Sequence, residues 1–313
     1  MKTKKQGRGK NKRKTSKYQK IANRLQNISE KSIVNEYSKL KIFSCKNALK
    51  ASGRTRLGNK IVDAFTFVER LHTKGHQNVS FYEFWEQRDN YKKKTYIQKM
   101  LEFYKTRNID EIRKFKYMYN LYFSSIAIFR PVMAMELYCR VKAKRVLDFT
   151  MGWGGRLVGA CALDLEAYYG VDTNTHLREP YKELVSFIQK QGTHTKIDLF
   201  FQDALTIDYS TLDYDCVFTS PPYYDLENYR GSEGKYKTKV KWNEQFYKPM
   251  FLNTYKHLKK GGYYCLNVPD EIYNDVCISV LGKCDKKIIL KKGERKIGQD
   301  KYKEYIYIWK KNI

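Results

Sequence analysis

An apolar, strand-like segment that ends in Ser220-Pro221-Pro222-Tyr223 is the part of this chain best suited to chemistry. Two consecutive prolines cannot continue a central strand, because they donate no ladder hydrogen bond and hold φ at about −65°. The turn therefore keeps a hydroxyl group, several main-chain carbonyls and an aromatic ring in a fixed relation. Such a set suits a flat ring that carries an amino group. The plainer interpretation is a strand that ends at its prolines.

Three other predicted strands end in residues that suit an adenosine-type ligand. The first runs into a glycine-rich turn, which begins at Asp148 and includes Gly152 and Gly154. Glycines let a backbone approach a ligand closely. Asp172 ends the second strand, where an acid accepts hydrogen bonds from ribose hydroxyls, and Asp203 follows the third, where it would meet an adenine amino group. We expect these residues to surround one site, unless acids and turns fall at strand ends by chance.

The elements that must position these residues begin at residue 145, where short β-rich runs start to alternate with helical stretches. The runs are 146–149, 167–172, 197–201, 216–218, 263–268, 288–290 and 305–309. This alternation predicts an α/β, Rossmann-like fold with a mostly parallel, seven-stranded sheet covered by helices on both faces. Ligands of such sheets bind beyond the carboxyl ends of the strands.

The chain before this sheet is predicted to be helical and basic. Apolar residues three and four apart form two stripes: Ile61, Phe65, Val68 and Leu71, then Phe115, Met118, Tyr122 and Ile126. The predicted organisation is a disordered basic arm over residues 1–20, a helical basic region over 21–125 that recognises nucleic acid, and a catalytic domain over 126–313. Aromatic residues alternate with Lys and Arg between 81 and 122, as core residues of amphipathic helices or as platforms for base stacking.

The net charge of +28 is concentrated in the first half of the chain. Residues 1–144 hold 35 Lys and Arg against 11 Asp and Glu, whereas residues 145–313 hold 26 against 22. The first 20 residues contain ten Lys and Arg and no acid. Such a field attracts a polyanion, and nucleic acid is the expected one. An acidic membrane surface or a nucleolar address is the alternative.

The cysteines and histidines predict neither a disulfide framework nor a metal site. Seven cysteines are scattered along the chain without a Cys-x-x-Cys pair, which is typical of a reduced intracellular protein without structural zinc. His72 and His76 have ligand-like spacing, but Gly75 interrupts the helix and no third ligand is near. No apolar run reaches the length of a membrane span, and no secretory signal follows the basic N-terminus.

Residues from about 129 to 311 resemble the S-adenosylmethionine-dependent amino-methyltransferases that modify exocyclic amines of bases, especially a branch found in phages and large DNA viruses. The motifs that carry this resemblance are Gly-Trp-Gly-Gly-Arg-Leu at 152–157 and Ser-Pro-Pro-Tyr-Tyr-Asp-Leu-Glu at 220–227. It implies S-adenosylmethionine as the cofactor and a catalytic role for Ser220, Pro221, Pro222 and Tyr223. The cofactor contacts that it implies are Phe129, Pro131, Asp148, Gly152, Gly154, Asp172 and Asp203.

The chain departs from common relatives in the glycine-rich turn. Phe149 and Thr150 replace Pro-Phe, and Trp153 stands between the glycines, where it either lines a pocket or packs beneath the turn. The segment 225–241 is rich in Gly, Tyr and Lys and is either a lid or a plain surface loop.

The expected activity is methylation of cytosine N4 or adenine N6 in DNA, on a base flipped out of the duplex and stacked on Tyr223. Ser220 in the first motif position is closer to the cytosine-N4 enzymes, and adenine remains open. The alternatives are an RNA base methyltransferase, a protein-glutamine methyltransferase (which would carry Asn before Pro-Pro-Tyr), or a non-catalytic nucleic-acid-binding protein. The expected location is a reducing compartment, namely host cytoplasm, nucleus or nucleoid.

Overall fold

The computed structural model describes residues 16–50, 55–75, 77–123, 126–224, 229–230, 235–289, 295–297, 300–302 and 305–312. Most of the predicted basic arm, His76, residues 225–228 of the second motif and Leu290 lie outside these ranges.

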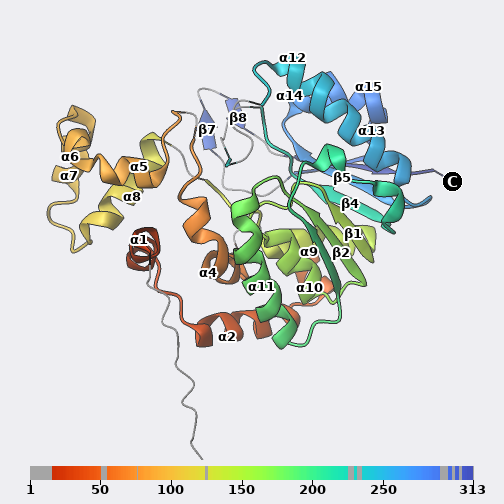
Figure 1. The fold of residues 1–313 in the computed structure, drawn as a ribbon, viewed down its shortest axis with the longest axis horizontal. Coiled ribbons are helices and arrows are strands. Elements are labelled where there is room, and N and C mark those ends of the chain that lie inside the picture. The colour runs from red at the N-terminus through yellow and green to blue at the C-terminus, as the bar shows by residue number, and fades with distance from the viewer. Residues whose placement is uncertain are drawn as a thin grey trace, which may run out of the picture.

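A seven-stranded sheet in the order β3-β2-β1-β4-β5-β9-β6 forms the centre of the molecule (Figure 1). Its strands are β1 (Arg145–Asp148), β2 (Ala167–Val171), β3 (Lys196–Phe200), β4 (Cys216–Thr219), β5 (Tyr263–Val268), β6 (Lys286–Ile289) and β9 (Tyr305–Lys310). Neighbours from β3 to β5 pair in parallel, and β9 runs antiparallel to both β5 and β6. The predicted seven-stranded, mostly parallel sheet is confirmed. A separate hairpin, β7 (Arg295–Ile297) with β8 (Asp300–Tyr302), was not predicted.

Alternate side chains of the central strands enter two separate hydrophobic clusters, one on each face of the sheet. In β4, Cys216 and Phe218 belong to the first cluster and Val217 to the second. In β9, Ile306 and Ile308 face the first cluster, whereas the neighbouring Tyr307 and Trp309 face the second. Because a strand directs successive side chains to opposite faces, continuous apolar runs of this kind require helices on both sides.

Helices cover both faces of the sheet. The N-terminal helices are α1 (Lys17–Leu25), α2 (Glu30–Lys41), α3 (Cys45–Lys50), α4 (Asn59–Arg70), α5 (Phe81–Glu86), α6 (Arg88–Tyr91), α7 (Thr95–Phe103) and α8 (Glu111–Tyr122). The first face carries α9 (Pro131–Val141), α10 (Gly155–Ala162) and α11 (Arg178–Lys190). The second carries α12 (Lys239–Trp242), α13 (Lys248–His257), α14 (Asp270–Ile272) and α15 (Ile278–Leu281), with π-helical turns at Asn243–Tyr247 and Tyr273–Cys277. Short 3-10 turns lie at Thr175–Leu177, Ala204–Thr206 and Tyr209–Thr211.

The N-terminal helices divide into two groups. Side chains of α2, α3 and α4 join the hydrophobic cluster on the first face of the sheet, together with α9, α10 and α11. Helices α1, α5, α7 and α8 instead form a third cluster with the end of α4, and Figure 1 shows α5 to α8 at one end of the molecule, away from the sheet. The shared core therefore crosses the boundary predicted at residues 125/126. We call α1 and α5–α8 the helical unit.

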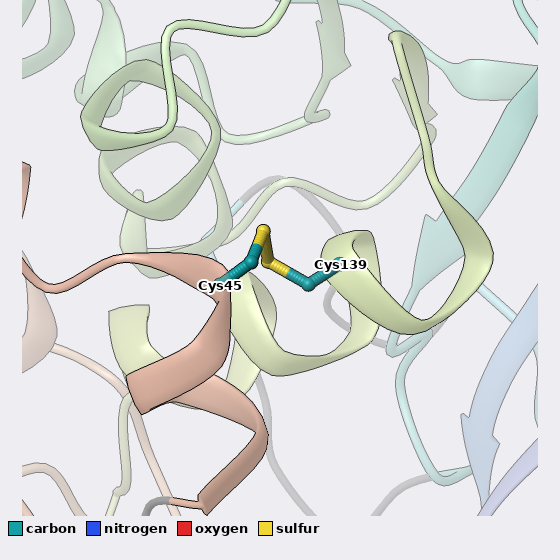
Figure 2. The surroundings of a disulfide bond; sticks show 2 residues. All are labelled: Cys45 and Cys139. Carbon is teal, nitrogen blue, oxygen red and sulfur yellow. A yellow bond between two sulfur atoms is a disulfide. The ribbon is translucent and has the colours of Figure 1, made fainter.

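A disulfide joins Cys45 at the start of α3 to Cys139 in α9, with the Cα atoms 5.4 Å apart (Figure 2). This corrects the prediction that the cysteines are all reduced. The two residues are 94 positions apart and meet only because α3 packs on α9. Cys161, Cys216, Cys265 and Cys277 are buried free thiols.

Two searches of the described part of the chain gave no candidates. No helix there is long and apolar enough to cross a membrane. No group of three His, Cys, Asp or Glu residues in those ranges is arranged to hold a metal ion.

Candidate functional site

The glycine-rich turn between β1 and α10 is shaped by close backbone contacts. Gly154 has φ of 94° at the N-cap of α10, a left-handed conformation that favours glycine. A Cβ atom on Gly155 would lie 1.8 Å from the carbonyl oxygen of Phe129, so no larger residue fits there. The predicted cofactor residues Phe129 and Pro131 thus lie beside α10. Pro131 is buried at the first position of α9, where its ring fills the space next to Gly58.

Asp148, predicted to line the cofactor, is fully buried at the end of β1. Its carboxylate accepts hydrogen bonds from Arg156 Nε at 2.6 Å and Nη2 at 3.1 Å, from Tyr168 Oη at 2.5 Å and from Thr219 Oγ1 at 2.8 Å. Burial alone would lower the pKa of Arg156, but the charge and hydrogen bonds of Asp148 raise it above its ordinary value. The ring of Phe129 lies 5.4 Å from the guanidinium carbon. All four donors are protein groups, so the side chain of Asp148 holds the turn.

Asp172, just after β2, is placed differently. Its side chain is partly exposed, and it accepts hydrogen bonds from the main-chain N–H groups of Gly152 at 2.9 Å and Asn174 at 2.8 Å. Burial raises the pKa of Asp172 to about 6, although both hydrogen bonds favour the ionised form. A carboxylate has about four acceptor sites, so two remain for other donors. The glycine-rich turn and the acid of the second strand therefore form one unit.

Asp203, after β3, forms the N-cap of a short 3-10 turn and accepts a hydrogen bond from the N–H of Leu205 at 3.1 Å. Its other oxygen accepts a hydrogen bond from Lys235 Nζ at 2.5 Å. Lys235 belongs to the segment predicted as a lid, and Arg230 of that segment pairs with Glu69 of α4 at 3.3 Å. The described residues of this segment thus bridge two sides of the candidate site.

The Ser220–Tyr223 turn follows β4, next to β1 at the point where the strand order reverses. Tyr247, which immediately precedes α13, supports the turn. Its hydroxyl donates to the carbonyl of Pro222 at 2.6 Å and accepts from the N–H of Tyr224 at 3.1 Å. Pro221 is buried, whereas Ser220 and Tyr223 are partly exposed. Crevices at such a reversal are the usual ligand sites of open parallel sheets.

Asn267 in β5 determines how the hydroxyl of Ser220 is used, and sequence reasoning missed it. The Tyr223 hydroxyl donates its single proton to the carbonyl oxygen of Asn267 at 3.1 Å. Ser220 Oγ lies 3.3 Å from Asn267 Oδ1 and 3.2 Å from Tyr223 Oη, and it donates its own proton to Asn267. The Asn267 amide is oriented by a hydrogen bond to the carbonyl of Tyr305 at 2.9 Å. Ser220 therefore keeps at least one lone pair to accept a hydrogen bond, even when Tyr223 Oη donates to it.

Helix α4 forms a further wall of the candidate site. The sequence analysis had placed this helix in the region predicted to recognise nucleic acid. Thr66 Oγ1 donates to the carbonyl of Trp153 at 3.1 Å, and Glu69 accepts from Asn174 Nδ2 at 3.1 Å. Burial raises the pKa of Glu69, while Asn174 and Arg230 oppose the rise. Trp153 is buried in the cluster on the first face, which favours packing beneath the turn over lining a pocket. A polar residue inside an apolar pattern was the available signal for Asn267, Thr66 and Glu69.

The sheet is Rossmann-like, with one antiparallel strand, β9, inserted between β5 and β6. No family profile matches this chain, and no curated protein matches it.

Several solved structures are similar to this chain at low sequence identity, and the similarity is one of fold alone. TrmN from Thermus thermophilus shows 16% identity and a TM-score of 0.36 over 58% of this chain and 48% of that one. An rRNA methylase from Streptococcus thermophilus shows 15% identity and a TM-score of 0.38 over 60% of this chain and 100% of that one. A putative RNA methyltransferase from Pyrococcus horikoshii shows 13% identity and a TM-score of 0.38 over 58% of this chain and 83% of that one.

Proposed function

We propose that this chain is an S-adenosylmethionine-dependent methyltransferase that acts on an exocyclic amino group of a base in nucleic acid. The observation that carries the proposal is the pairing, at adjacent strand ends, of the Asp172–glycine turn unit with the hydrogen-bonded Ser220–Tyr223 turn. The first suits a nucleoside cofactor and the second an amino-bearing ring. The strongly basic first half of the chain supports a polyanionic target.

The residues around Asp172 fit such a cofactor. Asp172 has two acceptor sites left for ribose hydroxyls. The space beside Gly152 is open to close approach, whereas Gly154 packs against Leu184 and Tyr181 of α11. The Oδ2 atom of Asp203, which accepts a hydrogen bond from Lys235, can accept a second one from an adenine amino group. Asp148 contributes through the position of the turn. When bound, the cofactor supplies an activated methyl group, whose C–S bond breaks as the N–C bond to the amine forms and one amine proton is released to water.

Ser220 is the residue that would act on the target amine. The lone pair of an exocyclic amine is delocalised into the ring, so accepting hydrogen bonds from its N–H groups localises that pair on nitrogen. Ser220 can accept because its proton is committed to Asn267, and a main-chain carbonyl of the proline turn is the second acceptor. Tyr223 offers a ring for stacking, anchored by its hydroxyl. The protein thus contributes alignment and electrostatics.

Both DNA and RNA are retained as the target polymer. The sequence analysis puts DNA first, through its resemblance to enzymes that modify cytosine N4 or adenine N6. Two of the three solved structures reported above are an rRNA methylase and a putative RNA methyltransferase, but their likeness to this chain concerns the fold alone. Electrostatic attraction by the basic region does not distinguish the two polymers.

The test measures methyl transfer from labelled cofactor to matched single-stranded RNA, single-stranded DNA and duplex DNA, with nucleoside mass spectrometry to identify the product. Ser220→Ala and Tyr223→Ala should abolish transfer while cofactor affinity stays within about tenfold, or roughly 1.4 kcal/mol. Ser279→Ala is the matched control, because this exposed hydroxyl bonds only locally, to the carbonyl of Val276. No cofactor binding in calorimetry, or wild-type turnover in Ser220→Ala, would remove the proposal.

A further inference from the structure

Most aromatic residues of the helical unit are core residues, but a few are not. Phe81, Phe84, Phe115 and Tyr119 are buried in the third cluster. In contrast, Tyr96 is 37% exposed, Phe103 54% and Tyr117 47%. The alternation of aromatic and basic residues in this part of the sequence therefore has two causes, and core packing accounts for only one of them.

The exposed rings lie on two helices that are in contact, α7 and α8. Tyr104 connects them, since its ring centroid is 5.2 Å from Phe103 and 6.1 Å from Tyr117. At the other end of the pair, Tyr96 lies 4.8 Å from Tyr122. Tyr96 and Phe103 share one face of α7, because they are seven residues apart. The helices are thus antiparallel neighbours, and their exposed rings form one surface.

Cations lie among these rings. The Arg107 guanidinium carbon is 4.2 Å from the ring centroid of Phe103. Lys99 is exposed one helical turn before Phe103, and Arg113 is exposed one turn before Tyr117. The three acids of residues 95–122 pair with other cations: Glu102 with Lys105, Asp110 with Arg24, and Glu111 with Lys92. Within the described ranges, Lys99, Arg107 and Arg113 form no ion pair with a carboxylate. We call Tyr96, Lys99, Phe103, Arg107, Arg113 and Tyr117 the α7–α8 surface.

From this surface we infer that the helical unit binds an unpaired stretch of nucleic acid by stacking its bases on Phe103 and Tyr117. Stacking requires bases whose faces are free, and the neighbouring unpaired cations are placed for the phosphates. Helix α1 packs on α8 and pairs Arg24 with Asp110 at 2.9 Å. In the sequence it follows residues 1–16, which hold eight Lys and Arg and no acid. The charge and the rings therefore belong to the same unit.

The position of the unit relates this surface to the candidate site. The third cluster includes Leu71, the C-cap of α4. Glu69, two residues earlier, contacts Asn174 and Arg230. Helix α4 therefore connects the helical unit, which would hold the nucleic acid, to the candidate site. This inference rests on the proposed function for its choice of ligand, although binding by stacking needs neither the cofactor nor methyl transfer.

The experiment compares two fluorescein-labelled single strands of about 15 nucleotides, one with bases and one abasic, by fluorescence anisotropy with the full chain. Phe103→Ala and Tyr117→Ala should each weaken binding of the base-bearing strand about fivefold or more and leave the abasic strand unchanged. Phe103→Trp should restore affinity. Lys99→Gln should weaken both strands alike, because its contact is to phosphate, and lower the salt slope by about 0.7.

Leu252→Ala is the matched control, since Leu252 is 55% exposed on α13, outside the helical unit. Affinity of Phe103→Ala and Tyr117→Ala within twofold of wild type, or an equal loss for both strands, would overturn the inference. Loss of binding to anionic vesicles with unchanged affinity for both strands would assign the surface to a membrane instead and would also overturn it. Cofactor calorimetry on the same variants separates this outcome from failure of the proposed function.

Discussion

Replacing Asp148 by Asn tests whether this acid stabilises the fold or contacts the cofactor. The substitution keeps the shape of the side chain but removes the charge that four donors share. Arg156 would remain 4% exposed with a donor amide in place of one carboxylate oxygen. Removing one partner of a buried ion pair costs about 3–5 kcal/mol. At about 2–4 °C per kcal/mol, the unfolding midpoint should fall by roughly 6–20 °C.

The assay is thermal unfolding followed by circular dichroism, with cofactor binding measured by calorimetry below the unfolding range. Asp213→Asn is the control, because Asp213 forms a half-exposed pair with Arg145, and such surface pairs contribute about 0–1 kcal/mol. Adding Arg156→Met to Asp148→Asn should recover part of the loss, since the unpaired buried cation is then removed. A midpoint within about 2 °C of wild type together with lost cofactor affinity would refute the reasoning and return Asp148 to the cofactor site.

Three further predictions concern titration and the disulfide. The pKa of Asp172 is raised to about 6, and ribose hydroxyls bond best to its ionised form, so cofactor affinity should fall by up to about tenfold per pH unit below pH 6. Calorimetry should find no such pH dependence in Asp172→Asn. Burial lowers the pKa of His72 to about 4, so the folded state takes up a proton on this side chain only at a lower pH than the unfolded state does. Stability should therefore fall as the pH drops from about 6.5 to 4. His72→Gln should flatten that fall in denaturant titrations, and an unchanged slope would contradict it. Thiol titration of the denatured, unreduced chain should count five free thiols among the seven cysteines, and a count of seven would exclude the disulfide. Cys45→Ser should lower the free energy of unfolding by up to about 4–5 kcal/mol.

The seven strands were predictable because each strand leaves a local signal. Apolar runs of strand length were bounded by Gly, Pro and Asp, and the observed strands begin and end within one or two residues of the predicted runs. The two helical stripes were equally local: α4 covers the first up to its C-cap, Leu71, and α8 covers the second up to Tyr122. The meeting of the glycine-rich turn, Asp172 and Asp203 at one edge follows from the general rule for parallel sheets.

The division of the N-terminal helices could not be predicted, because it depends on contacts between distant segments. Stripes on α2 and α4 look like those on α8, yet the first two pack on the sheet and the third packs in the helical unit. The Cys45–Cys139 disulfide was missed for the same reason, since nothing local to either residue indicates its partner.

The sequence by itself determined the elements, the order of residues at the strand ends and the uneven charge, because these depend on local periodicity and composition. The tertiary structure decided what each polar side chain does. It turned Asp148 inward onto Arg156, left Asp172 with acceptor sites to spare, and placed Asn267 of β5 against Ser220, which follows the neighbouring strand β4. The physical reason is that a buried polar group takes its role from the partners that satisfy its hydrogen bonds, and here those partners come from other strands and helices.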